Sequence, residues 1–232
     1  MHVTPRLAES LVEFARTLTG KFDISDVLND LSSRVTSVLD IAGAGVSLFS
    51  GTEVSYATAS SEQSAIVERV QGDRQSGPCV EAILTSADLL IENITEESQR
   101  WPEYVAAADT AGIAAVAALP MRNTIRIGAL SLYDTRVRQW TPAEVVTARV
   151  FADMATGYVL SASELERERR TVEQLQQALD SRVIIEQAKG IVANEYGISV
   201  DAAFVRIRTY ARSHNASLRS IAHAVVALGL RV

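Results

Sequence analysis

The stretch DSRVIIEQAKGIVANEYGIS, residues 180–199, has the composition of a helix that ends at a glycine. Helix-compatible residues continue to Tyr196, and Gly197 is the residue type that ends a helix in the left-handed conformation. Gly190, however, lies inside the helix, where glycine costs about 1 kcal/mol relative to alanine. A helix built only for packing would have Ala or Leu there. We therefore expect something to come close to the backbone at Lys189 and Gly190.

Two shorter amphipathic helices are expected after this one, capped by Ser199 and Ser217. Their inward stripes are Ala203, Phe204, Ile207, Tyr210 and Ala211 in the first and Leu218, Ile221, Ala222, Val225 and Leu228 in the second. With the helix that ends near Tyr196, they predict a three-helix bundle over residues 175–232.

Upstream of the bundle, TPAE at residues 141–144 is a capping box with proline at the first helical position. No proline follows before Tyr196, but we expect a break near Ser181 in preference to one continuous helix. Residues 161–174, which include ELERERR, are interpreted as a helical connector with coiled-coil character. A solvated single helix is the alternative.

The first 160 residues mix helical and strand patterns. Helices are expected from Thr4-Pro5, over residues 24–39 and 62–71, and after Pro102; strands are expected within 43–60, 88–93, 112–121 and 126–134. The pattern predicts an α+β fold in which helices flank an antiparallel sheet.

The composition is that of a globular chain with one full core and a smaller unit: 232 residues, 47% hydrophobic, mean hydropathy +0.11. No apolar run approaches the ~20 residues that span a bilayer, and no signal-peptide pattern is present. The lone Cys79 excludes an intramolecular disulfide and a cysteine-clustered metal site. We expect a cytoplasmic protein without a membrane partner, metal or cofactor. Cys79 is either a buried small hydrophobe or a redox-sensing thiol at a helix start.

The charge is uneven. Residues 175–232 hold seven basic and four acidic residues, a net +3, so the net −6 of the chain leaves −9 on residues 1–174. An acidic body with a basic tail predicts that any polyanion is bound by the tail. Ordinary scatter of charge is the alternative.

Basic side chains lie at the edge of the predicted bundle. Arg208 and Arg212 are four apart and therefore on one side of their helix, and Lys189 follows an apolar stripe in the same way. Arginine offers a planar fork for phosphates and a face for bases. Solvated surface charge is the other interpretation of these residues.

The segments LQQALDSRVIIEQAKGIV, DAAFVRIRTYA and LRSIAHAVV, within residues 172–230, resemble the ANTAR domain of bacterial transcription antiterminators. One departure is Val192-Ala193, where the family commonly has Leu-Met. The resemblance implies a three-helix bundle that binds paired RNA hairpins as a homodimer, with Ala188, Lys189 and Arg208 at the RNA contact. We add Arg182 and Arg212 from helix geometry.

The segments SGPCVEAI, RWPEY and IGALSLYD, within residues 6–160, resemble a GAF domain of the kind joined to ANTAR in actinobacteria. GAF domains serve unrelated ligands. The histidines are His2, His214 and His223, which leaves none in the sensory core to hold haem. Cys79 is followed by Val80, not by the histidine that bilin-binding relatives have. The cyclic-nucleotide pattern is absent too, so a small apolar ligand, a protein partner or no ligand remain open.

No triad order, metal-ligand spacing or phosphate-binding glycine loop appears, so we do not expect an enzyme. The expected organisation is a GAF sensory domain at 1–160, a connector at 161–174 and an ANTAR RNA-binding domain at 175–232. The expected function is signal-responsive binding of hairpins in nascent transcripts that promotes antitermination. The alternative is a dimeric protein-interaction or sensor module without RNA binding.

Overall fold

The structure, a computed structural model, describes residues 8–10, 12–14 and 23–232. The chain forms two compact units, residues 1–163 and 164–232. The predicted start of the first helix at Thr4-Pro5 lies outside the described residues, although 8–10 and 12–14 are helical and Phe14 is buried.

The first unit is built on a five-stranded antiparallel sheet of order β2-β1-β5-β4-β3. The strands are β1 (Gly43–Phe49), β2 (Val54–Ala59), β3 (Leu89–Ile91), β4 (Ala115–Arg122) and β5 (Arg126–Asp134). The predicted antiparallel sheet is confirmed. β4 and β5 are buried almost throughout, because both faces of the sheet are covered.

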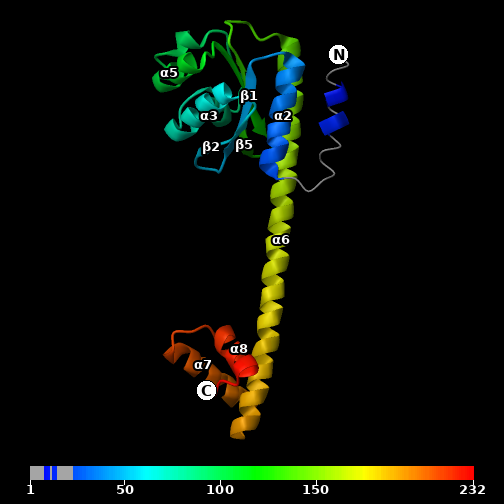
Figure 1. The fold of residues 1–232 in the computed structure, drawn as a ribbon, viewed down its shortest axis with the longest axis vertical. Coiled ribbons are helices and arrows are strands. Elements are labelled where there is room, and N and C mark those ends of the chain that lie inside the picture. The colour runs from blue at the N-terminus through cyan, green and yellow to red at the C-terminus, as the bar shows by residue number, and fades with distance from the viewer. Residues whose placement is uncertain (1–7, 11, 15–22) are drawn as a thin grey trace. The chain divides into compact units, whose positions relative to one another are not determined.

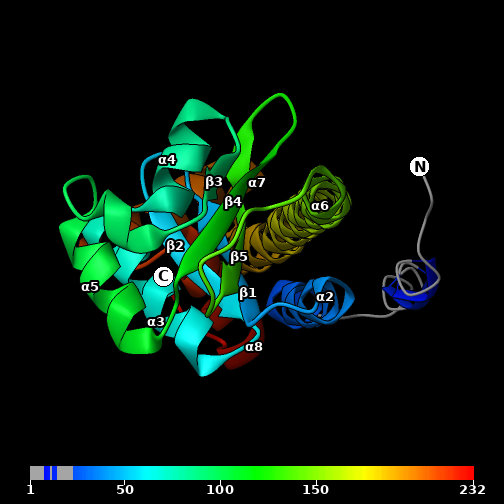
Figure 2. The same cartoon turned by 90° about the horizontal axis from the view of Figure 1, so that it is seen from above.

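One face of the sheet packs against α2 (Ile24–Leu39) and the first turns of α6 (Pro142–Tyr196), which run side by side (Figure 1). The other face is covered by α3 (Glu62–Arg74), α4 (Pro78–Thr85), α5 (Pro102–Ala111) and the short η1 (Ile94–Glu97). Seen from above, the sheet lies between these two groups of helices (Figure 2). The layered α+β arrangement agrees with the prediction.

α6 is one continuous helix from Pro142 to Tyr196, so the predicted break near Ser181 is wrong. The Ser181 hydroxyl donates to the Gln177 carbonyl one turn earlier, 2.6 Å away, and so does not cap a new helix. The helix ends only at Gly197, whose φ is +63°.

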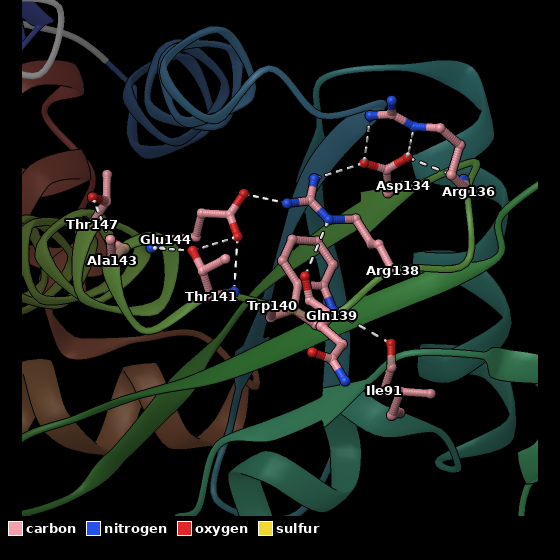
Figure 3. Close-up of polar contacts among 10 residues, drawn as sticks. All are labelled: Ile91, Asp134, Arg136, Arg138, Gln139, Trp140, Thr141, Ala143, Glu144 and Thr147. Atoms are coloured by element: carbon pink, nitrogen blue, oxygen red, sulfur yellow. Dashed lines mark hydrogen bonds and ion pairs between the residues drawn. The ribbon is translucent and has the colours of Figure 1, made fainter.

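The start of α6 is held to the end of β5 by a charged junction (Figure 3). The Thr141 backbone N–H donates to Glu144 at 2.8 Å, and the Glu144 N–H donates to Thr141 Oγ1 at 3.3 Å, which is the predicted capping box. Arg138 joins this box to the sheet, since it pairs with Glu144 and, at 2.9 Å, with Asp134. Burial alone would raise the pKa of Asp134, but hydrogen bonds from Arg136 and Arg138 outweigh it and hold the pKa below its ordinary value.

A polar cluster lies buried between the sheet and α3. Ser47 donates to the Glu68 carboxyl at 2.5 Å, and the Tyr133 hydroxyl donates to it at 2.6 Å. Gly45 makes room for this carboxyl, because a Cβ there would lie 2.7 Å from Glu68 Oε1. Glu68 has no ion pair with any residue that the structure describes, and burial raises its pKa despite the hydrogen bonds.

Cys79 lies at the edge of the same cluster, where its backbone N–H donates to the Gln71 side chain at 2.7 Å. The thiol is fully buried, and burial raises its pKa well above the ordinary value. A reactive thiolate needs a lowered pKa and solvent access, so the structure favours the packing interpretation of Cys79.

The second unit is a bundle in which α7 (Val200–Ser213) and α8 (Leu218–Leu228) pack on the last turns of α6. Ser199 and Ser217 cap the two short helices as predicted, by accepting from the N–H groups of Ala202 and Ser220.

Replacing Arg138 by Met tests the junction. We expect Arg138→Met to lower the free energy of unfolding of the first unit by about 2 kcal/mol, because it leaves buried Asp134 with only the exposed Arg136. Chemical denaturation monitored by Trp fluorescence measures this loss. Arg167→Met on the exposed part of α6 is the control; equal effects of the two substitutions would contradict the assignment.

Replacing Glu68 by Gln tests the buried carboxyl. A raised pKa in the folded state contributes stability that is fully present below the ordinary value of 4.5 and is lost as pH rises toward the folded-state pKa. The free energy of unfolding of Glu68→Gln should therefore increase relative to that of the wild type as pH rises above 4.5, by at most about 1.4 kcal/mol per pH unit, which urea denaturation at a series of pH values measures. The exposed Glu62→Gln is the matched control, and a difference that stays constant with pH would refute the interpretation.

Candidate functional site

The bundle core is built from small and branched apolar side chains that the three helices share. Its buried members are Ala188, Val192, Ala203, Ile207, Ala211, Ile221, Ala222, Val225 and Val232. Alanines at the contacts let the helices approach closely, which fixes the edge where α6 meets α7. The predicted basic residues lie on these two helices.

Ala188 does not lie where a surface contact residue should. Its side chain is fully buried in the bundle core. A methyl group at this position allows α7 to pack against α6, so in this structure Ala188 supports the edge and does not form its surface. Its predicted contact with RNA stays a prediction.

Lys189 reaches the edge but is partly covered. Its side chain is 14% exposed, and Nζ donates to both Glu186 oxygens at 2.9 Å. Nζ also lies over the Phe204 ring, 5.7 Å from its centroid. The lysine is thus held between a carboxylate on its own helix and an aromatic ring on α7.

Arg208 meets the same ring from α7. Its Cζ lies 5.6 Å from the Phe204 centroid, because residues four apart share one side of a helix. The structure therefore brings Lys189 and Arg208 together at one aromatic side chain. Phe204, predicted to face the core, is partly exposed and lies outside the apolar cluster of the bundle. Its neighbours Ala203 and Ile207 fill the core in its place.

Arg182 and Arg212 are exposed on α6 and α7. Within the described part of the chain, neither they nor Arg208 form an ion pair. By contrast, Arg231 pairs with Glu195 at 2.9 Å. Three of the four predicted cations are therefore available to an external anion.

Gly190 is exposed, and a Cβ added there would meet nothing within 4 Å. Packing within the chain does not require glycine at this position. Among the described residues, the site is thus a short edge with three arginines outside any ion pair, one paired lysine, one partly exposed phenyl ring and one helical glycine.

Two family models match the chain. A GAF domain model matches residues 23–158, which is more than half of the chain, and an ANTAR domain model matches residues 173–226. A search of curated proteins finds no match. ANTAR domains are RNA-binding regulators of transcription antitermination, and GAF domains are signal-sensing domains.

Solved structures resemble the first unit. The GAF domain of an Acinetobacter phosphoenolpyruvate-protein phosphotransferase has a TM-score of 0.55 and 9% identity, over 71% of this chain and 99% of that chain. A phycoerythrobilin-bound GAF domain from a cyanobacterial phytochrome has a TM-score of 0.55 and 11% identity, over 71% of this chain and 100% of that chain. Free methionine-R-sulfoxide reductase from Neisseria meningitidis, in complex with its substrate, has a TM-score of 0.55 and 12% identity, over 71% of this chain and 96% of that chain. At these identities the likeness shows the fold alone.

No helix among the residues that the structure describes is long and apolar enough to cross a membrane. The first unit, an antiparallel sheet covered by helices, agrees with the GAF match. The second unit, a bundle with a cationic edge, agrees with the ANTAR match. The chain belongs to the GAF family and is a GAF–ANTAR protein.

Proposed function

We propose that this protein is a signal-responsive regulator that binds hairpins in nascent transcripts in the cytoplasm and promotes transcription antitermination. The observation that carries the proposal is that Lys189 and Arg208 meet at one edge of the bundle. Arg182 and Arg212 are exposed on the same two helices. The ANTAR match supports the RNA partner. The proposed boundaries are 1–160 for the sensory domain, 161–174 for the connector and 175–232 for the RNA-binding domain.

Electrostatics support a small nucleic-acid contact. The bundle region is positive by three charges in a chain that is negative by six, so an RNA is attracted to the bundle and repelled by the rest. Four cations suit a short hairpin better than a long duplex. Because A-form helices hide their base edges in a narrow major groove, a bundle of this size reads unpaired loop bases and the phosphates beside them.

A second copy of the chain is the proposed partner along α6. Leu165, Val172 and Leu179 repeat every seven residues, Leu175 lies between the last two, and all four are between 52% and 65% exposed. This spacing places them at the a and d positions of a short coiled coil. An apolar stripe of this kind on a continuous helix favours a homodimer.

Charges beside the stripe favour a parallel pair of helices. With Leu165 at a, Glu164 is at g and Arg169 at the following e, the two positions that meet across a parallel dimer. Glu168 and Arg182 occupy d positions and limit the apolar seam to about two heptads. Two bundles joined in this way would bind two hairpins with a gain from effective concentration.

The alternative function is a dimeric interaction or sensor module without RNA binding. The observation that favours it is the state of Lys189, which is mostly covered and held by Glu186. For RNA binding, a phosphate must replace this carboxylate.

The RNA function is tested with Lys189→Ala/Arg208→Ala in the full chain. Hairpins of fixed stem and randomised loop are enriched on the wild-type protein, and affinities are measured at several salt concentrations. We expect the double variant to bind at least about tenfold more weakly and to lose about one unit of log-log salt slope per phosphate contact removed.

The matched control is Arg219→Ala/Arg231→Ala, which removes the same charge elsewhere on the bundle. Equal losses in the two double variants would reduce the proposal to non-specific attraction. Failure of the wild type to enrich any hairpin would favour the interaction module.

The dimer is tested with Leu175→Glu. Two buried leucines would be lost from the seam, one from each copy, so we expect the dimer to dissociate about a hundredfold more readily in sedimentation equilibrium. Gln177→Glu adds the same charge to the exposed helix face away from the seam and should leave the dimer intact. A wild type that sediments as a monomer would refute the proposed partner.

A further inference from the structure

Phe204 is an aromatic residue at the margin of the bundle core. It is partly exposed and lies outside the apolar cluster, which Ala203 and Ile207 on the same helix join. The part of the ring that stays exposed gains nothing from burial within the chain. That part is open to a bound group.

Two cations lie loosely over the Phe204 ring. Lys189 Nζ and Arg208 Cζ lie 5.7 and 5.6 Å from the ring centroid, near the outer limit of a cation–π interaction. At such partly exposed sites contacts of this kind are weak. The Arg206–Tyr196 contact, elsewhere in the bundle, is much closer at 4.0 Å. The Phe204 ring therefore holds its two cations loosely, while Lys189 is also held by Glu186.

We propose that Phe204 is the stacking platform for one unpaired base of the bound RNA, an inference that rests on the proposed RNA function. A base that enters displaces the two cations from the ring onto the phosphates beside that nucleotide. Base–aromatic stacking offsets the two loose ring contacts that are lost. Arg208 then makes charge-assisted hydrogen bonds to phosphate, which are stronger than its contact with the ring, and for Lys189 a phosphate replaces the Glu186 carboxylate.

Two features next to the platform favour a nucleotide as the occupant. Gly190 follows Lys189 and leaves open space where any other residue would place a side chain. Arg208 and Lys189 approach the ring from different helices, so both can reach backbone phosphates around a base on the ring. An unpaired base in a hairpin loop has the exposed face that stacking needs.

The experiment is a double-mutant cycle between protein and RNA. The probe is a hairpin enriched on the wild-type full chain, together with variants in which each loop nucleotide in turn is abasic. We expect Phe204→Leu to bind the intact hairpin about tenfold more weakly. At one loop position the abasic change should cost the wild type about as much, yet cost Phe204→Leu almost nothing, because the two changes remove the same contact.

Salt dependence separates stacking from charge. Phe204→Leu keeps both cations, so its log-log salt slope should equal that of the wild type, whereas loss of Lys189 or Arg208 lowers the slope. Phe204→Tyr keeps the ring and should retain most of the affinity. Tyr196→Leu, which removes another aromatic ring of the bundle under an arginine, is the matched control and should leave binding unchanged.

The outcomes are distinct. If the wild type enriches no hairpin, the proposed function is wrong and the platform falls with it. If the wild type binds but Phe204→Leu binds equally well, the platform alone is refuted. The same holds if the loss of affinity caused by Phe204→Leu is additive with the loss at every abasic loop position. Circular dichroism melts of each variant show whether a weaker affinity comes from a bundle that is less folded.

Discussion

The cores of both units depend on α6. Phe151 and Ala155 fill the core beneath the sheet, and Ala188 and Val192 fill the core of the bundle, all from one helix. The helix begins at a capping box, contains no proline after its first residue and ends at a glycine with positive φ. Alanine is the commonest of its buried residues beneath the sheet and one of the two in the bundle core, so neighbouring elements can pack close to its backbone.

Local rules account for most of the fold. The capping box at residues 141–144 and the serine caps at Ser199 and Ser217 could be predicted, because a cap is a contact between residues near in sequence. The strands could be predicted from alternation and turn residues. The continuity of α6 through Ser181 could not be predicted, because a serine can either cap a new helix or donate to a carbonyl of the preceding turn. Only the observed hydrogen bond to the Gln177 carbonyl decides between the two.

The candidate site was predicted less completely. Lys189 and Arg208 are brought together as expected, but Phe204 was placed in the core because its spacing fits the inward stripe. On a narrow helix face, packing decides which apolar residue faces the core. In α7 the smaller Ala203 is the one buried in the bundle core. Glu68 was missed altogether, since polar residues are interspersed along α3 and no periodicity marks its buried side. The signal that could have found it is Gly45, a glycine inside a strand that leaves room for a facing side chain.

The bundle is the less strongly built of the two units. Its buried core consists mainly of alanine and valine, with Ile207 and Ile221 as its largest buried members, and α7 and α8 are short. A core of this size gains little free energy beyond the entropy it must overcome, so the helices depend on packing against α6. Anything that binds only the folded bundle then adds to its stability in proportion to the logarithm of its concentration. A ligand that bound at the edge around Lys189 and Arg208 would therefore be coupled to the packing of α7 on α6, because Lys189 on α6 and Arg208 on α7 both contact the Phe204 ring.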